Sequence, residues 1–538
     1  MSERRYKRGP SRDQVLLLPA CVEDYVGSDN PVRAIDAYVD GLDLEGLGFS
    51  NSQDVISKGQ PAYRPSDLLK LYIYGYLNRV RSSRRLEHET YCNLEVIWLL
   101  REIRPSYKTI ANFRKDNLSG LQSVNKNFVS VCKEFELFGC ELVAIDGSFF
   151  RGNASKGSIK TKKSLEKLLE MITRDISNYY DQLDKNDQQE EGQSQPQVDL
   201  QEKLEKLKEQ SKMIQKSLEF LDKNGQSQYS TTDPDARILK KRGQSTAGYN
   251  VQSVVDDKHK LMVVCEVVND GNDANQLHPM AQKAKEELEQ ETIEVVADTG
   301  YYNQSQIYNC QEEGITPYVA IPEKNKGEDD RINREEFQYD EKLDAYQCPG
   351  GHYLDRHGCQ KKGETINYKY TSKASTCADC PLKERCLPPK TPYRQIYRYE
   401  HEDVIQTHRD RMEQSGRDYM KKRAAMVEHP FGTLKLWLGW THFLLRGLEK
   451  VNAEMSLMML SYNFKRVLSI IGLNLFREYC LQRRPKPLPR PSDDSLFFAF
   501  FDLFIYFANK WINGFKNFGS GPFSTTMNFS KPAWPKFG

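Results

Sequence analysis

Three carboxylates stand out by their positions in the sequence. Asp146 closes the apolar run 141–145, Asp298 closes a second apolar run at 293–297, and Glu428 lies in a basic, helix-like stretch. Strand ends present functional side chains to solvent, and carboxylates that gather repel one another unless a cation neutralises them. Hard oxygen ligands suit Mg²⁺ or Mn²⁺, and two such ions can activate water in phosphodiester displacement. A single aspartate at a strand end is more often a turn residue, so the metal-site hypothesis depends on all three together.

A second group of residues has the spacing of a zinc site. It combines a Cys-x-x-Cys pair with one cysteine downstream and one upstream: Cys348, Cys377, Cys380 and Cys386. Soft thiolates favour Zn²⁺ over Mg²⁺, so such a site would be structural and separate from the carboxylates. His352 or Cys359 could replace Cys348 as the fourth ligand. The alternative is a loop of unpaired thiols.

Residues 1–135 are expected to be helical. Pro65 and Pro105 each introduce a helix, and the second gives a helix-turn-helix layout. Its last helix carries side chains that suit phosphate and base-edge contacts: Lys108, Asn112, Arg114 and Lys115. The alternative is an ordinary helical bundle with solvated arginines. Lys and Arg number 77 against 75 Asp and Glu, so the net charge of +2 excludes a uniformly basic coat but not local basic surfaces.

The pattern changes to strands with interleaved helices after about residue 136. Short apolar runs predict strands at 141–146, 249–255, 261–268, 293–298 and 316–321, with a helix at 277–288. Apolar residues three and four apart predict an inserted helical hairpin at about 160–225, interpreted as a spacer or an oligomerisation arm. This alternation indicates an α/β core.

Neither end of the chain has the pattern of a membrane segment. The apolar stretch 496–511 is charged and shorter than the roughly 18 residues that suggest a span. The apolar run near the N-terminus is too short for a signal-peptide core, so an intracellular protein is expected. Residues 481–538 read as a basic, Pro-rich linker followed by an aromatic tail.

Three sequence blocks, in this order, resemble the DDE transposases of bacterial insertion sequences. The blocks are Val143–Ser148 (VAIDGS), Val295–Tyr301 (VADTGY) and Tyr419–Lys435, which is similar to the Tyr–Arg–Glu–Lys signature of one large branch of that family. Three blocks in the right order are far more specific than any one of them. The resemblance spans roughly residues 15–470.

The third block matches its signature unevenly. The interval from Glu428 to Lys435 fits, whereas Tyr419 and Arg423 each lie one residue further upstream than in the commonest form. The resemblance implies that Lys435 contacts DNA phosphate near the cleavage site, and that Arg423 and Tyr419 position the transposon end. It also implies that Asp146, Asp298 and Glu428 hold catalytic Mg²⁺ or Mn²⁺.

The resemblance and the sequence patterns together predict the organisation of the chain, and the tail lies outside the resemblance. The fold would be an RNase H-like mixed sheet core of the α/β class, with an inserted helical hairpin, a cysteine-rich insertion and an N-terminal all-helical domain. The expected parts are a helical DNA-binding domain (1–135), the first part of the core (136–345), a cysteine-rich and zinc-binding insertion (346–392), the last part of the core (393–480) and the tail (481–538).

The activity implied by the resemblance is cut-and-paste transposition by metal-dependent strand cleavage and strand transfer. The implied partners are double-stranded DNA (the terminal inverted repeats of the element and the target) and a second copy of the chain in a homodimer. No membrane partner is implied, and the expected location is the bacterial cytoplasm. Two rivals are an RNase H-like nuclease that cuts without joining, and a transposase-derived regulator that has lost catalysis. The presence of all three acidic residues counts against the regulator.

Overall fold

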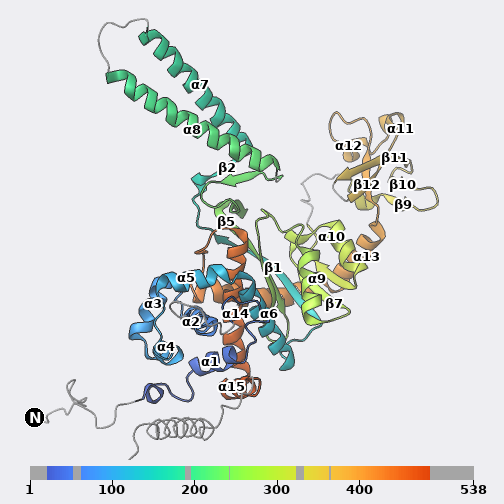
Figure 1. Cartoon of the computed structure of the whole chain (residues 1–538). Helices are drawn as coiled ribbons and strands as arrows, with labels where there is room; N and C mark the ends of the chain where they lie inside the picture. Colours follow the sequence, from blue (N-terminus) through green and yellow to red (C-terminus); the bar gives the residue numbers. More distant parts are fainter. Residues whose placement is uncertain are drawn as a thin grey trace, which may run out of the picture. The chain divides into compact units, whose positions relative to one another are not determined.

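The computed structural model describes residues 21–52, 62–187, 195–223, 225–241, 243–322, 332–362 and 365–484 (Figure 1). Within this part of the chain, the residues up to Gln482 belong to one compact unit. The expected Pro-rich linker and aromatic tail lie almost wholly outside the described residues, as does the apolar stretch 496–511.

The N-terminal part is helical, as the sequence predicts. Its helices are α1 (Val32–Asp40), α2 (Pro65–Leu77), α3 (Ser83–Cys92), α4 (Leu94–Leu99), α5 (Tyr107–Asp116) and α6 (Leu118–Glu134). Pro65 occupies the first turn of α2, where its missing N–H costs no hydrogen bond. The Ser106 side chain caps α5 by accepting from the Thr109 N–H.

A mixed six-stranded sheet follows. Its strands are β1 (Leu142–Arg151), β4 (Arg237–Lys241), β5 (Gln244–Asp256), β6 (Met262–Val268), β7 (Ile293–Ala297) and β8 (Ile315–Val319). The order is β4–β5–β1–β7–β8, with β6 also paired to β5. Strand β1 runs antiparallel to β5 and parallel to β7, and β8 is parallel to β7. Helices α9 (Leu277–Leu288) and α10 (Gln304–Glu312) occur in the β6–β7 and β7–β8 connections.

One expected strand end is wrong. Strand β1 does not stop at Asp146 but continues to Arg151, because its pairing with β5 extends to the partners Arg151 and Gly248. Its parallel pairing with β7 ends earlier, at Ala144 and Val296. Asp146 therefore lies inside a strand, just beyond the point where β7 stops pairing with it.

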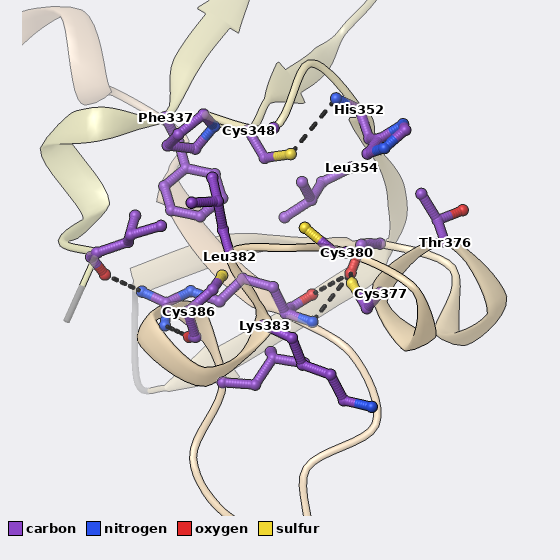
Figure 2. Close-up of a pocket in the computed structure, with 16 residues that line it drawn as sticks. Phe337, Cys348, His352, Leu354, Thr376, Cys377, Cys380, Leu382, Lys383 and Cys386 are labelled. Carbon is purple, nitrogen blue, oxygen red and sulfur yellow. Dashed lines mark hydrogen bonds between the residues drawn. The ribbon is translucent and has the colours of Figure 1, made fainter.

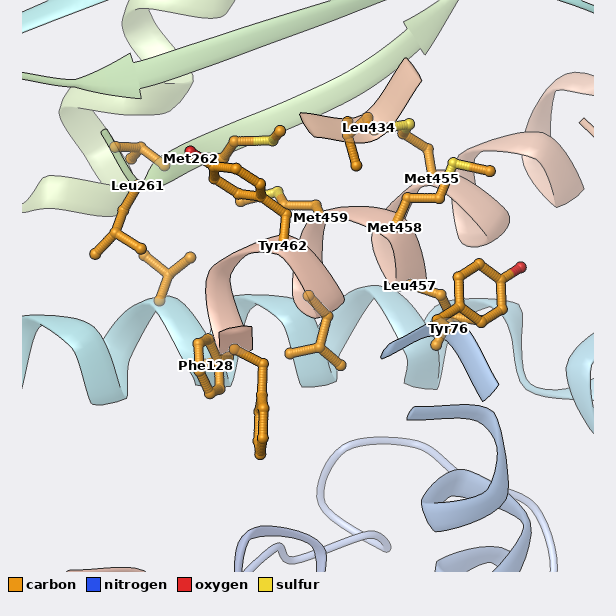
Figure 3. Close-up of a cluster of buried hydrophobic side chains, with 14 of the residues drawn as sticks. Tyr76, Phe128, Leu261, Met262, Leu434, Met455, Leu457, Met458, Met459 and Tyr462 are labelled. Carbon is orange, nitrogen blue, oxygen red and sulfur yellow. The ribbon is translucent and has the colours of Figure 1, made fainter. Parts of the chain in front are cut away.

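Helix α14 (Leu448–Ile471) joins the N-terminal helices to the sheet. Figure 3 shows its methionines between α6 and β6, with Met455, Met458 and Met459 in the same cluster as Phe128 and Met262. Every one of these side chains is buried. The N-terminal helices and the sheet consequently share one hydrophobic core and do not form separate cores.

The predicted helical hairpin is present. Helices α7 (Lys162–Asp187) and α8 (Gln195–Lys223) pack along an apolar seam of their own, and the short strands β2 (Ile159–Thr161) and β3 (Gln228–Ser230) pair at its base. Figure 1 shows the two helices side by side.

A second, antiparallel sheet lies between β8 and the helix that carries Glu428. Its strands are β9 (Gln338–Asp340), β10 (Ala345–Gln347), β11 (Tyr353–Lys362), β12 (Thr365–Thr371) and β13 (Gln395–Tyr399), and it includes the short helices α11 (Ala374–Ala378) and α12 (Lys383–Cys386). The chain then forms α13 (Glu402–Gly432), the π-helical turn η5 (Thr433–Trp437), α14 and α15 (Leu473–Gln482). No helix in the described ranges is long and apolar enough to cross a membrane.

Candidate active site

Asp146 and Asp298 come from neighbouring parallel strands. Leu142, Val143 and Ala144 of β1 pair with residues 294–296 of β7. The two strands therefore run side by side toward the aspartates. Asp298 follows β7 directly and caps a short 3-10 turn, η3 (Thr299–Tyr301), by accepting from the Gly300 N–H at 2.9 Å. The strand pairing thus places the first two predicted carboxylates at one point of the sheet.

Arg423 of α13 connects these two aspartates. Its Nη2 donates to Asp146 Oδ1 at 2.8 Å and to Asp298 Oδ2 at 3.3 Å. The side chains are 16% exposed for Arg423, 20% for Asp146 and 43% for Asp298, so the bridge is partly shielded from water. The guanidinium supplies the positive charge that two adjacent carboxylates need. The predicted role of Arg423 in positioning the transposon end stays a prediction.

The packing of α13 on the sheet holds Arg423 in this position. Tyr419, one turn before Arg423, donates to Glu294 Oε2 at 2.7 Å and stacks on Tyr318 of β8 with ring centroids 3.6 Å apart. One turn after it, Met426 and Val427 are buried against apolar side chains of β1 and β7. Because these residues recur every three or four positions, one face of α13 lies on the sheet.

Glu428 does not lie on that face. It follows Arg423 by five positions, which turns it by roughly 140° around the helix, and its side chain is exposed. Within the described residues no group of three or more His, Cys, Asp or Glu side chains is arranged to hold a metal ion. The structure therefore brings together two of the three predicted carboxylates and not the third.

A polar network behind Asp146 was not assigned a role from the sequence. Asp273 Oδ1 accepts from Asn250 Nδ2 and Gln252 Nε2, both at 2.6 Å, and the Tyr301 hydroxyl donates to Gln252 Oε1. Burial raises the Tyr301 pKa, and the nearby carboxylates of Asp273, Asp146 and Asp298 raise it further. Asn250 and Gln252 alternate with the apolar residues Tyr249 and Val251 in β5, and this alternation was the signal that could have revealed the network.

Gly147 is required by the same network. A Cβ atom at this position would lie 2.7 Å from Asp273 Oδ1, 2.8 Å from Gln252 Nε2 and 3.0 Å from the Tyr301 hydroxyl. The first two contacts are shorter than real Cβ atoms show and the third is at that limit, so a side chain here would displace Asp273 or Gln252. The Asp-Gly pair of the first sequence block thus has a packing reason.

Lys435 is close to β1 as well. On η5, its Nζ donates to Ser148 Oγ at 2.6 Å and to the Phe149 carbonyl at 2.7 Å, and it lies 4.4 Å from the centroid of the Phe150 ring. Lys435 therefore joins η5 to the strand that carries Asp146. Its predicted contact with DNA phosphate stays a prediction.

The four predicted contact residues of α5 divide into two kinds. Lys108, Asn112 and Lys115 are exposed, so a DNA contact stays a prediction for them. Arg114 is buried, with its guanidinium carbon 5.6 Å from the centroid of the Tyr72 ring. Because its charge faces the interior, Arg114 is not available to DNA in this structure, contrary to the sequence expectation.

The cysteine cluster occupies a separate pocket. Figure 2 shows the four candidate ligands around it: Cys348, Cys377, Cys380 and Cys386. His352 also lines this pocket, whereas Cys359 is exposed on β11 and is not among its lining residues. Burial raises the Cys386 pKa, and Arg394 opposes this effect. The thiols surround one space without being gathered at ligand distance.

Comparisons with known proteins find two transposase domains in the chain. A transposase domain (DUF772) matches residues 20–116, and a transposase DDE domain matches residues 222–464. The second match contains Asp298, Glu428 and Lys435, whereas Asp146 precedes it. No curated protein matches the sequence.

A solved structure also matches, the piggyBac transposase synaptic complex with hairpin DNA. It has 11% sequence identity, covers 91% of this chain and 90% of that chain, and has a TM-score of 0.24. This superposition is too poor to carry an argument. The identification depends on the two domain matches, which fall on the N-terminal helices and on most of the α/β region. The chain carries a transposase domain and a transposase DDE domain, and the DDE domain identifies it as an enzyme of DNA transposition.

Proposed function

We propose that the chain moves its own insertion sequence by a cut-and-paste reaction, in which divalent metal ions support phosphodiester hydrolysis and then strand transfer. The observation that carries this proposal is the meeting of Asp146 and Asp298 at one point of the sheet, where both accept from Arg423. Carboxylate oxygens are the donors that Mg²⁺ and Mn²⁺ prefer, so this pair fits such an ion. When bound, the ions would activate the attacking oxygen and stabilise the leaving one.

We infer that the main sheet is an RNase H-like core. Its antiparallel strands β1, β5 and β6 are followed by β7 and β8, both parallel to β1, which is the arrangement expected of such a core. The first two carboxylates would then lie on the central strand and its parallel neighbour. Pairing of two element ends would require two copies of the chain.

The protein groups have distinct parts in this proposal. Asp146 and Asp298 hold the ions, and Asp273, Gln252 and Tyr301 fix the strand behind Asp146 through their hydrogen bonds. Arg423 neutralises the carboxylates. Glu428 is the third proposed ligand, and its exposed position on α13 means that its part needs a test separate from that of the aspartates.

The decisive experiment uses a plasmid that carries the native gene with its flanking DNA. Wild type should give excised and rejoined DNA, and Asp146→Asn should give neither while still binding duplex DNA. Glu428→Gln tests the third ligand, with Glu413→Gln as the matched control because Glu413 is an exposed acid of the same helix. Excision by Asp146→Asn would refute the site.

The products distinguish the rivals. A nuclease would leave cut ends without newly joined DNA, and a regulator would bind DNA without cutting it. Both outcomes would contradict transposition. Loss of excision in Asp146→Asn but not in Glu428→Gln would assign the metal to the aspartates and remove Glu428 from the site.

We infer separately that the cysteine pocket binds a structural Zn²⁺ ion. The support is the convergence of four cysteines on one pocket, with Cys348 and Cys380 sulfurs both near Gly350 (Figure 2). Purified protein should contain about one zinc per chain, and Cys380→Ser should lose it. Cys359→Ser is the control, because Cys359 lies outside the pocket. A zinc content near zero in freshly purified wild type would refute the inference.

A further inference from the structure

A second pocket lies at the end of α13. It has a volume of about 230 Å³, and residues of three distant segments line it: the end of α2, the turn from α13 into η5, and α14. Its polar lining includes His429, Tyr462, Lys465 and Arg466, and no Asp or Glu among the described residues contributes to it. The pocket is therefore electropositive, and part of its wall is aromatic.

Trp437 lines the pocket and contacts two basic side chains, Lys465 and Arg79, which together with the pocket form a basic surface. The indole is 48% exposed, with Lys465 Nζ 3.2 Å and the Arg79 guanidinium carbon 4.7 Å from its centroid. Cation–π contact lets the ring hold two cations that would otherwise repel each other. Burial lowers the Lys465 pKa and the positive charge of Arg79 lowers it further.

The other basic side chains at or near the pocket are Arg466, His429 and Lys260. Arg466 donates through Nε to the His259 carbonyl, and it has no carboxylate ion-pair partner within the described part of the chain. Burial lowers the His429 pKa, and the charges of Arg466 and Lys260 lower it further. Lys260 is the exception, because it pairs with Asp257. An anion in the pocket would relieve the repulsion among these groups.

The position of the pocket suggests which anion. Trp437 and Lys435 lie on the same π-helical turn, and Lys435 contacts the residues that follow Asp146 in β1. A strand of DNA held at the pocket would consequently pass close to the proposed active site. Arg79 extends the basic surface to the N-terminal transposase domain, because it follows α2 directly.

We propose that this pocket binds a backbone phosphate of duplex DNA. Lys465 and Arg466 of its lining and the neighbouring Arg79 are the cations, and the Trp437 ring holds Lys465 and Arg79. This assignment depends on the proposed function, because it takes DNA as the substrate. Phosphate contacts position a protein on DNA without reading its sequence, so the site serves any duplex.

The test measures binding of a short fluorescein-labelled duplex by anisotropy at several salt concentrations. The variants are Lys465→Gln and Arg79→Asn, the latter because Arg79 has a φ of +64°, which asparagine tolerates better than most residues. Each lost phosphate contact should lower the slope of log K against log salt by about 0.9. Lys465→Arg should keep the wild-type slope, and Lys450→Gln, an exposed lysine of the same helix, is the matched control.

The outcomes separate this inference from the proposed function. An unchanged slope in both variants, with tight binding by wild type, overturns the pocket and leaves transposition intact. An equal loss in Lys450→Gln also overturns it, because the effect would then be one of net charge. Absence of duplex binding by wild type would overturn the proposed function and the pocket together.

Discussion

Replacing Arg423 by glutamine tests whether its charge holds Asp146 and Asp298 together. Glutamine is polar and uncharged, so the two carboxylates would face each other without a cation. Breaking a buried ion pair costs roughly 3–5 kcal/mol, and an exposed pair contributes at most about 1 kcal/mol. With side-chain exposures of 16% for Arg423, 20% for Asp146 and 43% for Asp298, the free energy of unfolding should fall by an intermediate amount, about 2 kcal/mol.

The same variant should respond more strongly to divalent ions. The guanidinium and a metal ion would use the same carboxylate oxygens, so the loss of Arg423 should strengthen Mn²⁺ binding. Ligands that bind only the folded state raise its stability in proportion to RT ln(1 + [L]/Kd). Urea unfolding of wild type and Arg423→Gln, each with and without Mn²⁺, measures both effects.

The control is Arg417→Gln, an exposed arginine of the same helix. It should change stability by less than about 0.5 kcal/mol and leave the Mn²⁺ response unaltered. Unchanged stability of Arg423→Gln would show that the bridge contributes nothing. An equal Mn²⁺ response in Arg423→Gln and wild type would show that the arginine and the ion do not compete for these carboxylates.

Three further predictions concern the elements around the site. Burial lowers the pKa of His408 to about 4, and the positive charges of Arg411 and Arg409 add to this effect. The imidazole binds a proton near pH 6.5 in the unfolded chain but only near pH 4 in the folded protein. The free energy of unfolding should therefore fall as the pH is lowered from about 6.5 to 4. His408→Gln should remove about 3 kcal/mol of this loss of stability, so its urea unfolding midpoint should change less with pH than that of wild type. An unchanged pH profile would contradict this role of His408. Tyr419→Phe loses the hydrogen bond to Glu294 and should cost about 1 kcal/mol in urea unfolding, so an unchanged midpoint would argue against that bond. Gly147→Ala should destabilise by roughly 1–3 kcal/mol through its clash with Asp273 and reduce excision, whereas normal stability and activity would refute the packing account.

Local pattern determined much of the architecture. The apolar runs at 249–255, 261–268 and 293–298 predicted strands β5, β6 and β7, and the three- and four-residue spacing at 160–225 predicted the α7–α8 hairpin. These features depend on the alternation of side chains along a strand and around a helix, which neighbouring residues set. Asp146 and Asp298 were selected because they close the apolar runs 141–145 and 293–297.

Helix phase and burial were decided by tertiary contacts. The five-residue spacing puts Arg423 and Glu428 on different faces of α13, but it does not say which face is covered. The sheet makes that choice, and Arg423 lies on both aspartates while Glu428 is exposed. Arg114 likewise looked like a DNA contact until the packing of α5 placed it beside Tyr72.

The extent of the core also needed the tertiary structure. The change of pattern near residue 136 predicted a helical N-terminal domain. Helix α14, more than 300 positions later, packs against α6 and β6, so that domain shares its core with the sheet. The basic pocket has the same origin, since Arg79, Trp437 and Lys465 are far apart in sequence. The sequence by itself determined the elements and their chemistry, and the tertiary structure decided which side chains meet, because contacts between distant segments are set by packing and not by local spacing.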